Sequence, residues 1–258
     1  MPPTPMATRP TSLRQLYIAE LPRLYAFAYD MSGARDEAHR FLSELVDQTN
    51  DEAAELLAAP IPADALLGAF ARHLEKELGR RAEQSFQILD NVLRSDITRP
   101  IDINARGIDG DPRRIHLLLW ELKRTCLTAV MGCLPPSVRL SFILTDILGY
   151  SPADAADLLD IKESAYRVRL TRARKRLEDY LTPRCFHVDR QNPCNCEGRL
   201  GIAFDAKFVT PPPHALDTPA EEIDSEPPRR DMAALYRSLP RVALSEGEVA
   251  ELIGRVSA

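Results

Sequence analysis

The sequence is poor in aromatic residues and in glycine, and it has no long apolar run. Aromatic residues make up 6% of the 258 residues, with Trp120 as the single tryptophan, and glycine occurs 11 times. Leu, Ala and Arg recur throughout, so the interior is expected to be aliphatic and helical rather than that of a β-sandwich. No segment approaches the roughly 18 continuous apolar residues of a membrane helix. The first ten residues lack the apolar stretch of a signal peptide, and we therefore expect a cytoplasmic protein with no membrane contact.

Signatures of catalysis are also missing. The sequence contains no glycine-rich phosphate loop and no Ser/His/Asp arrangement. Its five histidines are scattered along the chain. We therefore do not expect an enzyme.

The charge of the chain is unevenly distributed. The net charge is −5, from 33 basic and 38 acidic residues. Residues 162–181 alone carry seven basic and three acidic side chains, a net +4, which leaves −9 for the rest of the chain. A positive segment on an acidic protein is typical of a surface reserved for anions such as phosphate.

Prolines and apolar periodicity divide the chain into helical segments. Apolar residues recur at three- and four-residue intervals over most of residues 12–182, including one long helix expected over 63–93. The fold class predicted is all-α, with two small helical domains joined by a linker. The expected parts are a flexible arm (1–11), a helical domain (12–94), a linker (95–112), a helix-turn-helix domain (113–182), a cysteine-rich segment (183–204) and an acidic, proline-rich, partly disordered tail with a terminal helical patch (205–258).

Residues 134–181 have the pattern of a helix-turn-helix. Gly149 ends one helix, and Ser151 and Pro152 provide an N-cap and a first-turn proline for the next. After a turn at 159–161, the last helix has an apolar face and an opposite basic face, as a recognition helix in a major groove requires. The alternative is that this basic face is simply solvated or binds an acidic partner. The apolar face comprises Tyr166, Leu170, Ala173, Leu177 and Leu181.

This run resembles the promoter-binding C-terminal domain of bacterial sigma factors, specifically those of the extracytoplasmic-function (ECF) group. The matching positions are Leu134-Pro135, Arg139, Gly149-Tyr150-Ser151, Leu159-Asp160, Tyr166 to Leu170, Arg172-Ala173-Arg174 and Leu177. Two positions depart from the family pattern: Asp160 replaces a glycine of the turn and Tyr166 replaces a valine. Aspartate tolerates a left-handed backbone better than most residues, so the turn is expected to survive.

The resemblance implies that the last helix reads the upstream promoter element. Ser164 and Arg167, near its N-terminal end, are the candidates for contacts with base edges. The remaining basic residues are candidates for phosphate contacts. They are Arg169, Arg172, Arg174, Lys175 and Arg176.

The N-terminal half resembles the other half of these sigma factors more weakly, over residues 16–46. The resemblance implies a helix that binds core RNA polymerase, with Asp36, Glu37, Phe41 and Glu44 as the candidate contacts. Candidates for binding melted promoter DNA are Phe70, Arg72, His73, Arg80 and Arg81, and an ordinary helix with Phe70 in the core is the alternative.

Three cysteines and a histidine lie within 12 residues, at Cys185, His187, Cys194 and Cys196. Four such ligands can close one tetrahedral site, and thiolate-rich sets favour Zn(II) or Cu(I). The segment resembles the cysteine-rich extension of metal-responsive sigma factors; the alternative is unlinked thiols. Cys126 and Cys133 are expected in the core.

The favoured interpretation is a sigma factor that binds core RNA polymerase and promoter DNA, with metal control through the cysteine-rich segment. DNA binding itself requires no cofactor. Residues 232–236 and 242–256 have apolar spacing suited to docking, so this tail or a separate anti-sigma factor is the candidate regulator. The alternatives are a stand-alone helix-turn-helix regulator and a metal-storage or interaction protein.

Overall fold

The structure is a computed structural model that describes residues 9–80, 82, 84–95, 112–205, 207, 209, 229–239 and 241–257. Within these residues the chain is helical and contains no strand, only an isolated bridge, so the prediction of an all-α fold is confirmed. No helix in this part of the chain is long and apolar enough to cross a membrane. The first eight residues of the expected arm and nearly all of the expected linker and of segment 205–228 lie outside the described residues.

The chain divides into two compact units. Unit 1 comprises Met1–Ala82, Pro135–Ala173 and Arg241–Ala258. Unit 2 comprises Glu83–Leu134 and Arg174–Pro240. Each unit is therefore assembled from segments that are far apart in the sequence.

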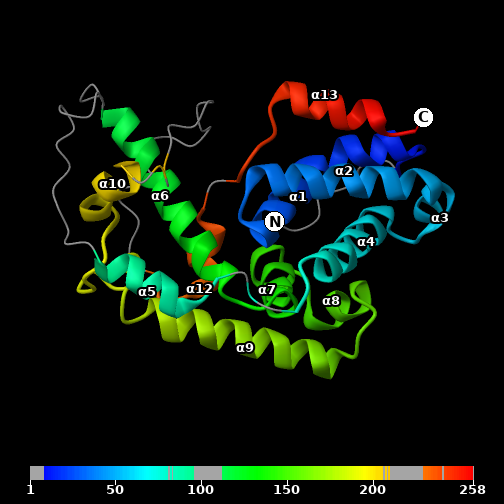
Figure 1. Cartoon of the computed structure of the whole chain (residues 1–258). Helices are drawn as coiled ribbons and strands as arrows, with labels where there is room; N and C mark the ends of the chain where they lie inside the picture. The colour runs from blue at the N-terminus through cyan, green and yellow to red at the C-terminus, as the bar shows by residue number, and fades with distance from the viewer. Residues whose placement is uncertain are drawn as a thin grey trace. The chain divides into compact units, whose positions relative to one another are not determined.

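Unit 1 begins with four helices, α1 (Leu13–Ser32), α2 (Arg35–Asp51), α3 (Ala53–Ala58) and α4 (Pro62–Glu77) (Figure 1). The Ser12 hydroxyl caps α1 by accepting a hydrogen bond from the Gln15 backbone N–H, and Gly33 ends the helix at φ 79°. The apolar faces of the helices close around an aliphatic and aromatic core. Buried members of this core include Leu16, Tyr17, Leu24, Phe27, Phe41, Leu45, Leu66, Phe70 and Leu74.

The prediction of a single helix over residues 63–93 is wrong, because two helices occupy this range. Helix α4 ends at Glu77, and Gly79 adopts φ 73°. The next helix, α5 (Phe86–Ser95), begins nine residues after α4 ends and belongs to unit 2. A left-handed residue breaks the helical hydrogen-bond ladder, which apolar periodicity alone does not reveal.

The helix-turn-helix predicted from the sequence is present. Helix α7 (Pro136–Phe142) continues into a π-helical turn, η2 (Ile143–Ile147), and is followed by α8 (Pro152–Leu158) and α9 (Glu163–Leu181). After this helical segment, Gly149 adopts the left-handed conformation, with φ 86°. The Ser151 hydroxyl accepts from the Asp154 backbone N–H, and Pro152 occupies the first turn of α8, both as predicted.

Both departures from the family pattern have a structural reason. Asp160 adopts φ 53°, the left-handed conformation expected of it, so the turn between α8 and α9 is preserved. Tyr166 is fully buried, and its hydroxyl donates to the Ser141 carbonyl at 2.9 Å and shares a hydrogen bond with the Thr145 hydroxyl at 2.8 Å. Tyrosine therefore adds hydrogen bonds that join α9 to α7 and to η2, which valine could not make.

Unit 2 is built on α6 (Pro112–Gly132). Helix α10 (Cys196–Asp205) packs along α6, and the Tyr236 hydroxyl of α12 (Met232–Arg237) donates to the Leu127 carbonyl of α6 at 2.9 Å. At the end of α9, the Tyr180 ring packs on Phe86 of α5, with centroids 4.7 Å apart. The buried cluster between α6 and α10 comprises Leu118, Leu122, Leu200, Ala203 and Val209.

The last helix, α13 (Glu246–Arg255), belongs to unit 1 and lies beside α1 and α2 (Figure 1). Its buried face contains Leu252 and Ile253. The Arg255 guanidinium pairs with the Asp47 carboxylate at 2.6 Å, and the Asn50 amide donates to the Arg255 carbonyl at 2.9 Å. The expectation that residues 242–256 dock on another part of the chain is therefore confirmed.

Candidate DNA-binding surface and cysteine cluster

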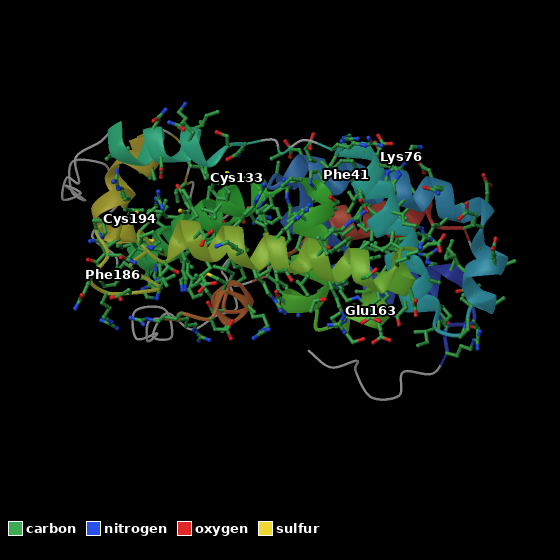
Figure 2. The ribbon with its side chains drawn as sticks, turned by 90° about the horizontal axis from the view of Figure 1, so that it is seen from below. Phe41, Lys76, Cys133, Glu163, Phe186 and Cys194 are labelled. Atoms are coloured by element: carbon green, nitrogen blue, oxygen red, sulfur yellow. The ribbon has the colours of Figure 1, made fainter. Side chains whose placement is uncertain are left out.

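Helix α9 has one buried face and one exposed face, as the sequence predicts. Tyr166, Leu170, Ala173 and Leu177 are buried against the rest of the protein. The exposed side of the helix begins at Glu163, which is labelled in Figure 2, and is mostly basic from Arg167 to Arg176, before Glu178 and Asp179 near its end. Its exposed residues between Ser164 and Arg176 are Ser164, Ala165, Arg167, Val168, Thr171, Arg172, Arg174, Lys175 and Arg176.

Two of these basic side chains form ion pairs along the helix surface. Arg167 pairs with Glu163 at 2.6 Å, and Lys175 pairs with Asp179 at 3.0 Å. Both pairs are solvent-exposed, with the Arg167 side chain 61% exposed. Pairs of this kind are weak and screened by salt, so both cations are accessible to a competing anion.

Val168 is a surface residue that the sequence prediction missed. Its side chain is 51% exposed and lies among the basic residues of α9. An apolar side chain among cations can contact the methyl group of thymine in a major groove. The sequence signal is its position: Val168 lies two residues from both Tyr166 and Leu170, which places it off the buried face of the helix.

Arg169 differs from its neighbours on α9. Its side chain is only 27% exposed, and its guanidinium pairs with the Glu75 carboxylate of α4 at 3.1 Å. The expected phosphate contacts therefore fall into two groups: Arg169 is engaged by another helix of unit 1, and Arg172, Arg174, Lys175 and Arg176 have exposed side chains.

The cysteine-rich segment folds into a tight loop in unit 2. The backbones of Cys185 and Cys194 pair in an isolated β-bridge, and both thiols are free. In this bridge the Phe186 backbone N–H donates to the Cys194 carbonyl at 3.0 Å. The His187 Nε2 atom lies 3.4 Å from the Cys196 sulfur. Cys194 and the neighbouring Phe186 are labelled in Figure 2. The loop therefore brings the four predicted ligand residues into one region.

Cys126 also belongs to this region, although the sequence indicated only a core position. It lies one and two helical turns from Leu122 and Leu118, which pack against the α10 cluster containing Cys196. Burial, and then the proximity of the Cys185 and Cys194 thiols, raise the pKa of Cys126 to about 12. The shared four-residue spacing along α6 is the sequence signal that could have identified it.

Burial likewise raises the pKa of Cys185 and raises that of Cys196 well above its ordinary value. The described residues contain no group of three His, Cys, Asp or Glu side chains already arranged around a metal position. The chemistry of the donor set, thiols with an imidazole, suits a soft metal ion. Metal binding would release protons and draw these side chains together.

Residues 124–177 match the family model "Sigma-70, region 4". The match begins in α6, includes α7, η2 and α8, and ends within α9. A region 4 domain of this kind implies interaction with promoter DNA and with core RNA polymerase. Comparisons with curated proteins and with solved structures gave no significant match.

Within the region 4 domain, Arg139 is a structural residue. It is 1% exposed, and its guanidinium donates to the Met31 carbonyl at the end of α1. In this chain the arginine therefore attaches α7 to the N-terminal helices of unit 1.

The candidate polymerase contacts lie on α2. Asp36 and Glu37 are exposed in its first turn, where acidic side chains favour the helix dipole. Phe41 is buried, and its ring meets that of His73 edge to face. Glu44 accepts hydrogen bonds from Arg40 at 2.6 Å and from His73 at 3.1 Å. Although partial burial disfavours its charge, these two hydrogen bonds lower the pKa of Glu44.

Two of the residues considered for binding melted DNA, Phe70 and Arg72, have structural roles in α4, whereas Arg80 lies beyond the end of this helix. Phe70 is fully buried and packs edge to face on Phe27, at 5.9 Å between centroids. Arg72 donates to the Leu158 carbonyl. The alternative of an ordinary helix with Phe70 in the core is therefore confirmed, and Arg81 lies outside the described residues.

Proposed function

We propose that the protein is a sigma factor of the ECF type, which binds core RNA polymerase and directs it to specific promoters. The observation that carries the proposal is the region 4 match over a helix-turn-helix whose last helix exposes a continuous basic face. In this proposal residues 113–182 bind the upstream promoter element and residues 12–94 bind polymerase. The protein supplies no catalysis, because transcript synthesis belongs to the polymerase, and it acts in the cytoplasm where that enzyme is found.

The exposed side chains of α9 are assigned either to base edges or to phosphates in this proposal. Ser164 and Arg167 contact base edges from the first turns of the helix, with Val168 against a thymine methyl. Arg172, Arg174, Lys175 and Arg176 contact phosphates further along, and Arg169 joins them when it leaves Glu75. A base contact of this kind contributes about 1–3 kcal/mol of discrimination.

Polymerase binding is assigned in this proposal to α2. Asp36 and Glu37 present their carboxylates to the partner directly. Phe41 holds the helix in position through its buried ring, and Glu44 presents a carboxylate that is kept ionised by Arg40 and His73. An anti-sigma factor, or the chain's own C-terminal tail, regulates this activity.

We further propose that Cys185, His187, Cys194 and Cys196 bind zinc or copper and so make the activity metal-responsive. Support comes from the backbone pairing of Cys185 with Cys194, from the 3.4 Å approach of His187 Nε2 to the Cys196 sulfur, and from the nearby thiol of Cys126. The metal draws thiolate and imidazole ligands to one point and thereby rigidifies the junction between α9 and α10.

The decisive experiment is a pull-down of core RNA polymerase by the tagged full-length protein, followed by run-off transcription from fragments of its own genome. Polymerase binding with a promoter-dependent transcript is expected. DNA binding without polymerase binding would contradict the proposal and would favour the stand-alone helix-turn-helix regulator, a candidate that gains support from the burial of Phe70.

A pair of double variants tests the DNA surface. Arg172→Ala with Arg176→Ala should weaken duplex binding and reduce the slope of log affinity against log salt by about two phosphates. Arg14→Ala with Arg241→Ala removes the same charge from two exposed positions outside α9, one in α1 and one before α13, and should leave that slope unchanged. Equal effects of the two pairs would show that the basic face of α9 does not bind DNA, as expected of a metal-storage or interaction protein.

A further inference from the structure

Helix α4 contacts the helix-turn-helix of unit 1 at three levels along its length. Near its start, the Tyr150 hydroxyl, at the entry to α8, donates to the Asp64 carboxylate. In its middle, Arg72 donates to the carbonyl of Leu158, the last residue of α8. Near its end, Glu75 pairs with Arg169 of α9. Helix α4 therefore contacts the helix-turn-helix from the beginning of α8 to the second turn of α9.

Gly68 allows the two helices to approach this closely. A Cβ atom at this position would lie 2.9 Å from the Leu158 carbonyl oxygen and 3.2 Å from the Arg72 guanidinium. Contacts below 3.0 Å require the neighbouring backbone to move. A helix without a side chain at this point can lie directly against the end of α8, and the Arg72 guanidinium then satisfies the carbonyl.

The third contact involves a side chain of the basic face itself. Arg169, Arg172 and Arg176 are spaced three and four residues apart, so they form one row along α9. Arg172 and Arg176 are exposed, whereas the first member of the row is held by Glu75, with both side chains of the pair 27% exposed. A carboxylate presents two oxygens to a guanidinium much as a phosphate does. Glu75 therefore occupies the position on Arg169 that a DNA phosphate would take.

We propose that α4 is a latch in cis on the helix-turn-helix, in which the Glu75 carboxylate competes with DNA phosphate for Arg169. The partner that opens the latch is duplex DNA, through its phosphate backbone. In the latched form the first member of the arginine row is withheld from the duplex, and the Asp64 carboxylate of α4 is held by Tyr150 at the entry to α8, the helix that crosses the backbone in this motif. On binding duplex DNA, Arg169 exchanges Glu75 for a phosphate, and α4 separates from α8.

The inference rests on the proposed DNA contact of α9, and two matched substitutions in α4 test it. Glu75→Gln removes the competing carboxylate, and Glu77→Gln makes the same change of charge at an exposed residue two positions away. Affinity of the full-length protein for a short duplex of mixed sequence is measured by fluorescence anisotropy over a range of salt concentrations. Glu75→Gln should bind about two- to fivefold more tightly than Glu77→Gln, since the pair it removes is of the modest kind.

The slope of log affinity against log salt should also steepen by about one phosphate in Glu75→Gln. Adding Arg169→Gln should cancel both the gain in affinity and the change in slope, because the released cation is then absent. This result would establish that the gain comes through Arg169 and not through a general reduction of negative charge.

The outcomes separate the latch from the function on which it rests. If all variants bind the duplex but Glu75→Gln and Glu77→Gln do so equally, the latch is refuted while DNA binding by α9 stands. If neither the unmodified protein nor Glu75→Gln binds duplex DNA in low salt, the latch and the DNA-binding function are both wrong. Hydrogen exchange gives a second readout: DNA should increase the exchange of α4 amides, and unchanged or slower exchange would also overturn the latch.

Discussion

Substitution of Gly68 by alanine should destabilise the protein, although alanine is the better helix former. In an ordinary helix interior, replacing glycine by alanine stabilises by about 0.5–1 kcal/mol. At Gly68 the added Cβ meets the Leu158 carbonyl at 2.9 Å. Overpacking of this kind costs about 1–3 kcal/mol, because backbone and not a flexible side chain must give way. The two effects leave a net loss of about 0–2.5 kcal/mol.

Gly247→Ala is the matched control, since this glycine of α13 has nothing within 4 Å of the position a Cβ would occupy. It should gain up to about 1 kcal/mol. Thermal unfolding followed by circular dichroism should then give the Gly68 variant the lower midpoint of the two, by several degrees at about 2–4 °C per kcal/mol. Equal stabilisation by both substitutions would refute the close approach of α4 to α8.

Three further substitutions test other parts of the structure. Tyr166→Phe should lower the free energy of unfolding by about 1–2 kcal/mol, because it removes two hydrogen bonds from a buried hydroxyl; urea denaturation would show no change if those bonds contribute nothing. Glu44→Gln should lower the thermal midpoint at neutral pH. Its effect should fade as pH falls below the ordinary carboxyl value of 4.5, because the lowered pKa makes Glu44 stabilising only while it is ionised; an effect that persists in acid would exclude the ionised carboxylate as its cause. Cys126→Ser should reduce zinc or copper affinity in equilibrium dialysis. Cys133→Ser, one residue past the end of α6, should not, since its thiol donates to the Ala129 carbonyl; equal metal affinity of the two variants would remove Cys126 from the cluster.

The local features of the fold could be predicted from the sequence because each depends on neighbouring residues. The cap at Ser151, the positive φ at Gly149 and Asp160, and the buried stripe of α9 all follow from side chains within a few positions of one another. The exposed basic face follows from the same periodicity.

The long-range contacts could not be predicted, because they depend on which surfaces fit together. The pairing of Glu75 with Arg169 joins residues 94 positions apart, and the pairing of Asp47 with Arg255 joins residues 208 positions apart. Nothing in a one-dimensional pattern indicates that Gly68 leaves room for a carbonyl. Cys126 illustrates the same limit, since its membership of the cysteine cluster depends on how α10 packs on α6.

The docking of α13 on α1 and α2 affects how the protein folds as it is synthesised. The ribosome makes α2 long before it makes α13, and at about 5–20 residues per second the 208 positions between Asp47 and Arg255 take roughly 10–40 s. During this interval the apolar surface that receives Leu252 and Ile253 is open to water on the nascent chain. Unit 1 therefore reaches its final form only after translation of its third segment, and this delay makes the nascent N-terminal helices a natural substrate for chaperones.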